Sequence, residues 1–185
     1  MLQATGLSCV RSGRRLFSGL SFSLDAGTLL RIAGPNGSGK TSLLRILCGL
    51  LTPEAGEVRR NGGLIYLGHA PAVNDELSAA ENLAVACDLA GLPRHAIGAA
   101  LERFGVPGGP VKRLSQGQRR RAALARLVLG ESVPLWLLDE PLTALDTVAA
   151  GLTKALIQNH VASGGAVGYT THQDAGLRDS RVIEL

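Results

Sequence analysis

Aromatic and charged residues are scarce in this sequence. Aromatic side chains make up 3% of the 185 residues and charged side chains 18%, whereas hydrophobic residues reach 45%. The hydrophobic share excludes a disordered chain, and the shortage of aromatic residues predicts an aliphatic core of the kind found around buried parallel strands. No stretch rich in Pro, Gly or Ser is long enough to divide the chain, so we expect one domain over residues 1–185.

Long hydrophobic runs are also lacking. No stretch of about 18 uncharged apolar residues occurs, and residues 1–15 do not show the basic-then-apolar order of a signal peptide. We therefore expect neither a leader peptide nor a membrane span. Any role at a membrane would then depend on another chain.

Cysteine content and charge exclude two further classes of protein. The cysteines Cys9, Cys48 and Cys87 are far apart and lie in apolar surroundings, which indicates reduced core thiols rather than a disulfide framework or a metal site. The formal net charge is +4, but the arginines are scattered in pairs and triplets with no aromatic residues between them. We therefore expect no nucleic-acid partner.

Strand and helix patterns alternate along the sequence. Apolar runs bounded by turn residues predict strands at residues 16–24, 29–33, 64–67, 135–138, 166–170 and 181–185. Capping residues and helix breakers predict helices at residues 41–50, 78–90, 94–104, 115–129 and 147–162. The alternation is typical of an α/β fold with a mostly parallel sheet. A Gly/Pro-rich linker at residues 105–110 marks residues of about 75–113 as a small inserted helical subdomain.

The segment after the strand at residues 29–33 has the pattern of a phosphate-binding loop, G-x-x-x-x-G-K-[ST], between a strand and a helix. The predicted ATP-binding residues are Gly34, Pro35, Asn36, Gly37, Ser38, Gly39, Lys40, Thr41 and Ser42. In such a loop, backbone N–H groups and the helix N-terminus surround the phosphate oxygens. Lys40 then reaches the β- and γ-phosphates, and the Thr41 hydroxyl ligates Mg²⁺.

Two carboxylates, Asp139 and Glu140, follow the apolar strand at residues 135–138. The phosphate-binding loop alone leaves a kinase, a GTPase and a transport ATPase open. Adjacent carboxylates at a strand end offer one group for a metal and one for water, so we assign Asp139 to Mg²⁺ and Glu140 to activation of the attacking water. A kinase does not need the second role, because its nucleophile is a substrate hydroxyl.

The third element is the segment Leu-Ser-Gln-Gly-Gln at residues 114–118. Ser115 and Gln118 have the spacing of a plain capping box. Gly117, however, would stand in the first turn of a helix, where glycine costs about 1 kcal/mol unless a ligand approaches the backbone. A phosphate is the candidate ligand.

Together with Ala144-Leu145-Asp146 and a late His172, these motifs occur in the order found in ATPases of the ABC transporter family, and the resemblance covers essentially the whole chain. It implies a P-loop NTPase fold with an ABC-type nucleotide-binding domain. It also implies two copies packed head to tail, with each ATP between one copy's phosphate-binding loop and the other's signature. The implied signature is Ser115, Gln116, Gly117 and Gln118. By the same resemblance, Asp146 joins the two sites and His172 contacts the γ-phosphate as a catalytic residue.

Two positions depart from the wider pattern of that family. Many members stack an aromatic side chain on adenine upstream of the phosphate-binding loop, whereas the nearest counterpart here is Arg11, whose planar guanidinium can stack on a purine. We therefore expect loose recognition of the base. Most members have a Mg²⁺-sensing glutamine where this chain has His69. Neutral His69 can ligate a metal, whereas protonated His69 would repel it, so His69 joins Thr41 and Asp139 as a candidate ligand.

Within the family, the sequence is most similar to the ATP-binding subunits of bacterial haem exporters that serve cytochrome c maturation. The similarity lies in residues 16–22, 66–69, 81–83 and 171–173. It implies an ATPase bound peripherally at the cytoplasmic face of the inner membrane, where it drives separate membrane-spanning permease subunits. The alternatives are an ABC transporter with a different substrate, a DNA-repair ATPase and a regulatory module without turnover. A DNA-repair ATPase would carry a long coiled coil between the phosphate-binding loop and the signature, whereas here only residues 41–114 separate them and show no heptads. A module without turnover would have a degenerate catalytic set, whereas Glu140 is present here.

Overall fold

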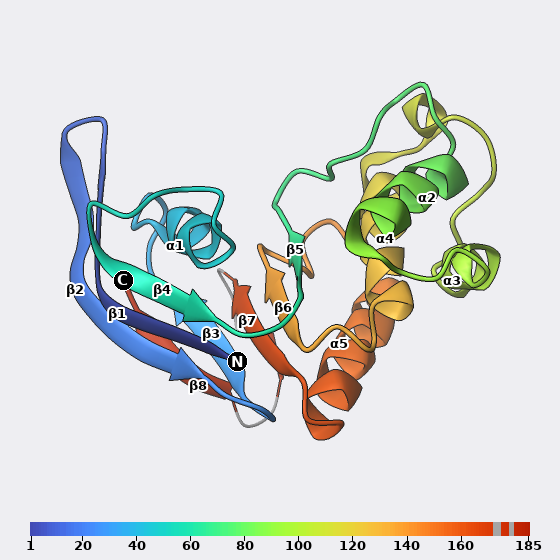
Figure 1. The fold of residues 1–185 in the computed structure, drawn as a ribbon. Coiled ribbons are helices and arrows are strands. Elements are labelled where there is room, and N and C mark those ends of the chain that lie inside the picture. Colours follow the sequence, from blue (N-terminus) through green and yellow to red (C-terminus); the bar gives the residue numbers. More distant parts are fainter. Residues whose placement is uncertain (172–174, 178–179) are drawn as a thin grey trace. The chain divides into compact units, whose positions relative to one another are not determined.

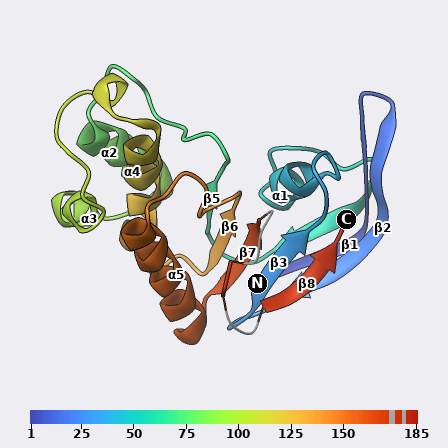
Figure 2. The same ribbon diagram turned by 180° about the vertical axis from the view of Figure 1, so that it is seen from behind.

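The computed structural model describes residues 1–171, 175–177 and 180–185 (Figure 1; Figure 2). The chain forms two compact units. The first contains residues 1–69, 133–141 and 157–185, and the second contains residues 70–132 and 142–156. The second unit therefore includes the residues of about 75–113 for which the sequence predicts a helical subdomain.

A five-stranded parallel sheet belongs to the first unit. Its strands stand in the order β5-β6-β7-β3-β8, and every neighbouring pair is parallel. Their bounds are β3 (Leu29–Ala33), β5 (Leu64–Leu67), β6 (Leu135–Leu138), β7 (Ala166–Thr170) and β8 (Ser180–Glu184). Every residue of β6 and β7 is buried. The prediction of a mostly parallel sheet with an aliphatic core is confirmed.

The first unit also contains an antiparallel sheet, of which the sequence analysis predicts only one strand. The order is β2-β1-β4. The bounds are β1 (Leu2–Arg11), β2 (Arg14–Leu24) and β4 (Ala55–Arg60). Buried side chains of β1, β2 and β3 form one core cluster with those of α1 (Lys40–Leu47). Helix α1 ends at Leu47 rather than at the predicted residue 50, and Gly49 turns the chain with φ 81°.

Helices make up most of the second unit. They are α2 (Ala79–Ala90), α3 (Ile97–Arg103), the 3₁₀ helix η1 (Val111–Arg113) and α4 (Gln116–Leu129). Ser78 and Ser115 begin α2 and α4 through the capping boxes that the sequence predicts. Helix α3 begins later than the predicted residue 94, and Arg94 instead forms an ion pair with Asp88 of α2. The buried core of this unit includes Ala79, Val111, Leu114 and Ala122.

Helix α5 (Thr147–Ala162) begins in the second unit and ends in the first. Its bounds agree with the predicted helix. No helix within the described residues combines the length and the apolarity needed to cross a membrane.

Candidate functional site

The predicted phosphate-binding loop connects β3 to α1, and its glycines have conformations that other residues rarely adopt. Gly34, Gly37 and Gly39 have φ of 146°, 78° and 110°. A Cβ atom at Gly34 would lie only 2.7 Å from the Leu185 carbonyl oxygen and the Ser38 hydroxyl oxygen. The backbone can therefore close into a tight loop only with glycine at these positions.

Lys40 and Ser38 have the positions expected of phosphate ligands in this loop. Lys40 is 7% exposed, and its ammonium group donates hydrogen bonds to the carbonyl oxygens of Gly34 (2.8 Å) and Pro35 (2.9 Å). The charge is thereby held over the loop. The Ser38 hydroxyl oxygen is buried, and no residue in the described part of the chain is its hydrogen-bond partner. A buried polar atom of this kind needs an acceptor or donor, so the loop fits the phosphates of a nucleotide.

The fold brings Thr41 and Asp139 into direct contact although 98 residues separate them. The Thr41 hydroxyl donates to Asp139 Oδ2 at 2.8 Å, and the Thr170 hydroxyl donates to Asp139 Oδ1 at 2.7 Å. Asp139 is only 1% exposed. Sequence reasoning missed Thr170, which ends β7 directly beside β6. A polar residue at the carboxyl end of a neighbouring parallel strand is the signal that could have identified it.

This donor set fits Mg²⁺ bound together with a nucleotide. Mg²⁺ usually keeps several waters and takes one or two protein oxygens plus substrate phosphates. Thr41 and Asp139 supply two oxygens. Within the described residues, no cluster of three or more His, Cys, Asp or Glu side chains forms a metal site by itself. Burial raises the pKa of the nearby Tyr66 phenol, and the Asp139 charge raises that pKa further, so the phenol stays neutral beside the carboxylate.

Glu140 has an unusual backbone conformation at the end of β6. Its φ is 52°, in the left-handed region that non-glycine residues rarely adopt. The Glu140 N–H donates to the Thr170 hydroxyl oxygen at 2.9 Å, which helps to hold this conformation. Strain of about 1–3 kcal/mol persists only where the surrounding structure enforces it, and such residues gather at functional sites. The geometry therefore supports a functional role for Glu140.

One cavity of about 490 Å³ collects most of the predicted nucleotide and metal residues of the first unit, although Gly34, Pro35 and Ser38 do not line it. It is lined by Arg11, Leu16, Asn36, Gly37, Gly39, Lys40, Thr41, Ser42, His69, Asp139 and Glu140. Sequence reasoning missed Leu16, which forms an apolar part of the wall. Leu16 also explains Gly39, because a Cβ atom there would lie 3.0 Å from the Leu16 Cβ.

Arg11 reaches this cavity from a tight hairpin between β1 and β2. Ser12 and Gly13 form the turn with φ of 49° and 75°, and Arg11 pairs with Arg14 across it. Two residues with positive φ are typical of a type I′ turn, whose twist matches antiparallel strands. The turn places Arg11 at the cavity, while Arg14 does not line it.

We predict that the chain binds ATP and GTP with affinities within about tenfold, or about 1.4 kcal/mol. The cavity offers the phosphates several ligands, whereas Arg11 would stack on either purine. A competition titration with purified protein measures the ratio, with Arg14→Ala as the control for Arg11→Ala. We expect only Arg11→Ala to weaken both nucleotides. A hundredfold preference for ATP would contradict loose recognition of the base.

The predicted signature lies at the start of α4 in the second unit. The Ser115 hydroxyl accepts from the Gln118 N–H at 3.2 Å, and Gln118 Oε1 accepts from the Ser115 N–H at 2.8 Å. Ser115 and Gln116 are exposed, so they are accessible to another molecule. A Cβ atom at Gly117 would lie 3.1 Å from the Ala144 carbonyl oxygen. This close approach within the chain is a second reason for glycine, besides the ligand that the sequence suggests.

The remaining predicted residues are Asp146 and His172. Asp146 Oδ1 accepts from the Ala149 N–H at 2.8 Å, so Asp146 caps the first turn of α5. Its other oxygen lies 3.7 Å from a guanidinium nitrogen of Arg121. His172 lies outside the described residues.

Comparisons with known proteins agree on one family. The family model described as ABC transporter matches residues 17–143. The chain is 52% identical to the cytochrome c biogenesis ATP-binding export protein CcmA of Aromatoleum aromaticum, over 95% of this chain and 90% of that protein. It is 48% identical to the protein of the same name from Nitrosomonas europaea, over 100% of this chain and 94% of that protein.

Solved structures share the fold. The structure of an ATP-binding subunit of an ABC transporter superposes with a TM-score of 0.89 at 22% identity, over 100% of this chain and 85% of that chain. A dimeric bacterial ABC transporter cassette superposes with a TM-score of 0.86 at 22% identity, over 100% of this chain and 94% of that chain. The α/β fold predicted from the sequence is therefore confirmed.

Proposed function

Because this chain belongs to the ABC transporter family, we propose that it is the ATP-hydrolysing subunit of an export complex that serves cytochrome c biogenesis. As a family member, it binds and hydrolyses ATP. Identity of 52% over nearly the full length of a protein named for cytochrome c biogenesis supports the cellular role. The proposal of ATP hydrolysis rests on the cavity that Lys40, Asp139 and Glu140 line together.

The residues of the cavity have separate roles in ATP binding and hydrolysis. Lys40 and the backbone of the loop bind the β- and γ-phosphates, and Lys40 offsets the charge that develops as the γ-phosphate leaves. Thr41 and Asp139 would hold Mg²⁺, which would neutralise phosphate charge. Glu140 takes the proton of the attacking water. The Thr170 hydroxyl holds the Asp139 carboxylate and the Glu140 backbone N–H in place.

A second copy of the chain completes each ATP site in this proposal. The exposed Ser115 and Gln116 and the glycine at 117 would close over the γ-phosphate that the other copy binds. The dimeric cassette with the same fold supports this arrangement. Asp146 would contribute to the contact between the two sites, in addition to capping α5. His172 would contact the γ-phosphate.

Separate membrane-spanning subunits are the proposed partners, with the chain at the cytoplasmic face of the inner membrane. The second unit has a groove of about 890 Å³ lined by residues 71–74 and Leu77, by α2 and by Arg126. Val85 and Leu89 of this groove are 50% and 86% exposed, which is unusual for large apolar side chains. We propose this groove as the docking face of the second unit, and the loop of His69 as a further contact of the first unit with the partner.

Haem is the proposed cargo, and partner chains rather than this cavity would carry it. The assignment of haem as the cargo rests on the similarity to haem exporters. A different substrate of the same transporter class is the alternative.

Co-purification with membrane subunits tests the docking face. We expect the tagged chain to retain membrane-spanning chains after detergent extraction of inner membranes, and we expect Leu89→Arg to lose most of them. Burial of one leucine side chain stabilises a complex by about 1.5–3 kcal/mol, which corresponds to tenfold weaker binding or more. Leu50→Arg is the control, because Leu50 is 68% exposed in the first unit. Equal retention by Leu89→Arg and the parent chain would exclude the groove.

A further inference from the structure

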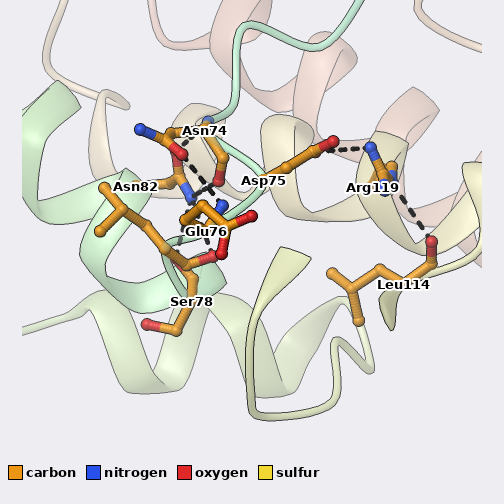
Figure 3. A network of polar contacts seen from close by, with 8 residues as sticks. Asn74, Asp75, Glu76, Ser78, Asn82, Leu114 and Arg119 are labelled. Atoms are coloured by element: carbon orange, nitrogen blue, oxygen red, sulfur yellow. Dashed lines mark hydrogen bonds and ion pairs between the residues drawn. The ribbon is translucent and has the colours of Figure 1, made fainter. Parts of the chain in front are cut away.

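Residues 74–78, the groove segment, run beside the groove into α2 and are held in place by a network of hydrogen bonds (Figure 3). The Asn74 N–H donates to Asn82 Oδ1 at 2.7 Å, and Asn82 Nδ2 returns a hydrogen bond to the Asn74 carbonyl oxygen at 3.0 Å. The Val111 N–H donates to the Leu77 carbonyl oxygen at 2.8 Å. The segment is thus bound to α2 on one side and to η1 on the other.

Arg119 links this segment to the residue before the signature. Its Nη1 donates to Asp75 Oδ1 at 2.6 Å, and its Nε donates to the Leu114 carbonyl oxygen at 3.2 Å (Figure 3). Leu114 is buried in the core of the second unit and directly precedes Ser115. The Arg119 side chain is only 29% exposed, so solvent screens the contact partly. One guanidinium therefore bridges the groove segment and the backbone at the signature.

We propose that Arg119 is a positioning residue, which orients Ser115 and Gly117 toward the ATP of the second copy and transmits movement of residues 74–78 to them. The inference rests on the proposed dimer. A planar guanidinium presents its donors at fixed angles and can hold a carboxylate and a carbonyl oxygen together, whereas an ammonium group has no such fixed geometry. A partner that docks in the groove would press on the segment that Asp75 belongs to.

A neighbouring ion pair serves as a control for the Arg119–Asp75 contact. Lys112 and Glu76 are joined at 2.6 Å, with side chains 49% and 73% exposed. Among the described residues, neither of these side chains hydrogen-bonds to residues 114–118. Loss of this pair should change the electrostatics of the same surface without moving the signature.

The test uses ATP-driven dimerisation in the Glu140→Gln background, measured by sedimentation with ATP and Mg²⁺. We expect Arg119→Lys and Asp75→Asn each to raise the dimer dissociation constant by about tenfold, because a charge-assisted hydrogen bond is lost or displaced. Glu76→Gln should stay within about twofold of the background. Binding of a fluorescent ATP analogue by the monomer should not change, because the phosphate-binding loop belongs to the first unit.

Each alternative result of this test overturns a stated part of the proposal. Unchanged dimerisation of Arg119→Lys, or an equal loss with Glu76→Gln, overturns the positioning role of Arg119. Loss of ATP binding by the Arg119→Lys monomer assigns Arg119 to folding and overturns the role as well. Failure of the Glu140→Gln background itself to dimerise with ATP overturns the proposed dimer, and the inference with it.

Discussion

Glu140→Gln is expected to lower the rate of ATP hydrolysis by about 10²- to 10⁴-fold, while ATP-dependent dimerisation persists. Glutamine keeps the size and hydrogen bonding of the side chain but cannot accept the proton of the attacking water. The Glu140 N–H, which donates to Thr170, is unaffected by the change. The phosphate ligands and the signature remain as well, so ATP should be trapped between two copies.

Phosphate release measures the rate, and size-exclusion chromatography with ATP and Mg²⁺ measures the dimer. Glu131→Gln is the matched control, because this exposed carboxylate pairs with Arg103 at 3.8 Å and does not line the cavity. We expect the control to hydrolyse ATP at the parent rate. Hydrolysis by Glu140→Gln at the parent rate would mean that another group activates the water.

Lys40→Ala is expected to lower hydrolysis by about 10³-fold or more and to weaken ATP binding as well. The ammonium group is buried and lies over the loop, where it would neutralise the β- and γ-phosphates in the bound state and in the transition state. A titration with a fluorescent ATP analogue and an assay of phosphate release separate the two effects. Lys154→Ala on α5 is the control, since this lysine does not line the cavity. Near-parent turnover by Lys40→Ala would contradict the assigned role.

The parallel sheet and the phosphate-binding loop could be predicted because their signals are local. Residues 135–138 form an uninterrupted apolar run, which a strand buried on both faces requires. The glycines around Lys40 have their conformations set by the loop itself. The signals that start the capped helices are local as well, because Ser78 and Ser115 each form a capping box with a residue three positions later.

Strands β1 and β4 were missed for different physical reasons. In β1, buried positions shift from Leu2 and Ala4 to Leu7 and Cys9, because the pairing slips around Gly6 at φ 62°. The slip breaks the period of two that marks a half-buried strand. In β4, Val58 is the one residue that is not exposed, so no apolar pattern exists to be recognised.

Contacts between distant segments could not be read from the sequence. Thr170 contacts Asp139 only because β7 pairs with β6 in register. Gly117 has a carbonyl neighbour, Ala144, from a separate loop, which no local pattern reveals. The bridge from Asp75 to Arg119 spans 44 residues and depends on how the helices of the second unit pack.

Haem-stained gels of membranes from cells that carry Lys40→Ala as their sole copy of the chain test the central claim most directly. The proposed function predicts that c-type cytochromes with covalently attached haem are lost, while cytochromes that bind haem without a covalent bond still form. Cells with Lys154→Ala should match the parent. Normal levels of covalent haem in the Lys40→Ala cells would contradict a role in cytochrome c biogenesis, although the chain would remain an ABC ATPase.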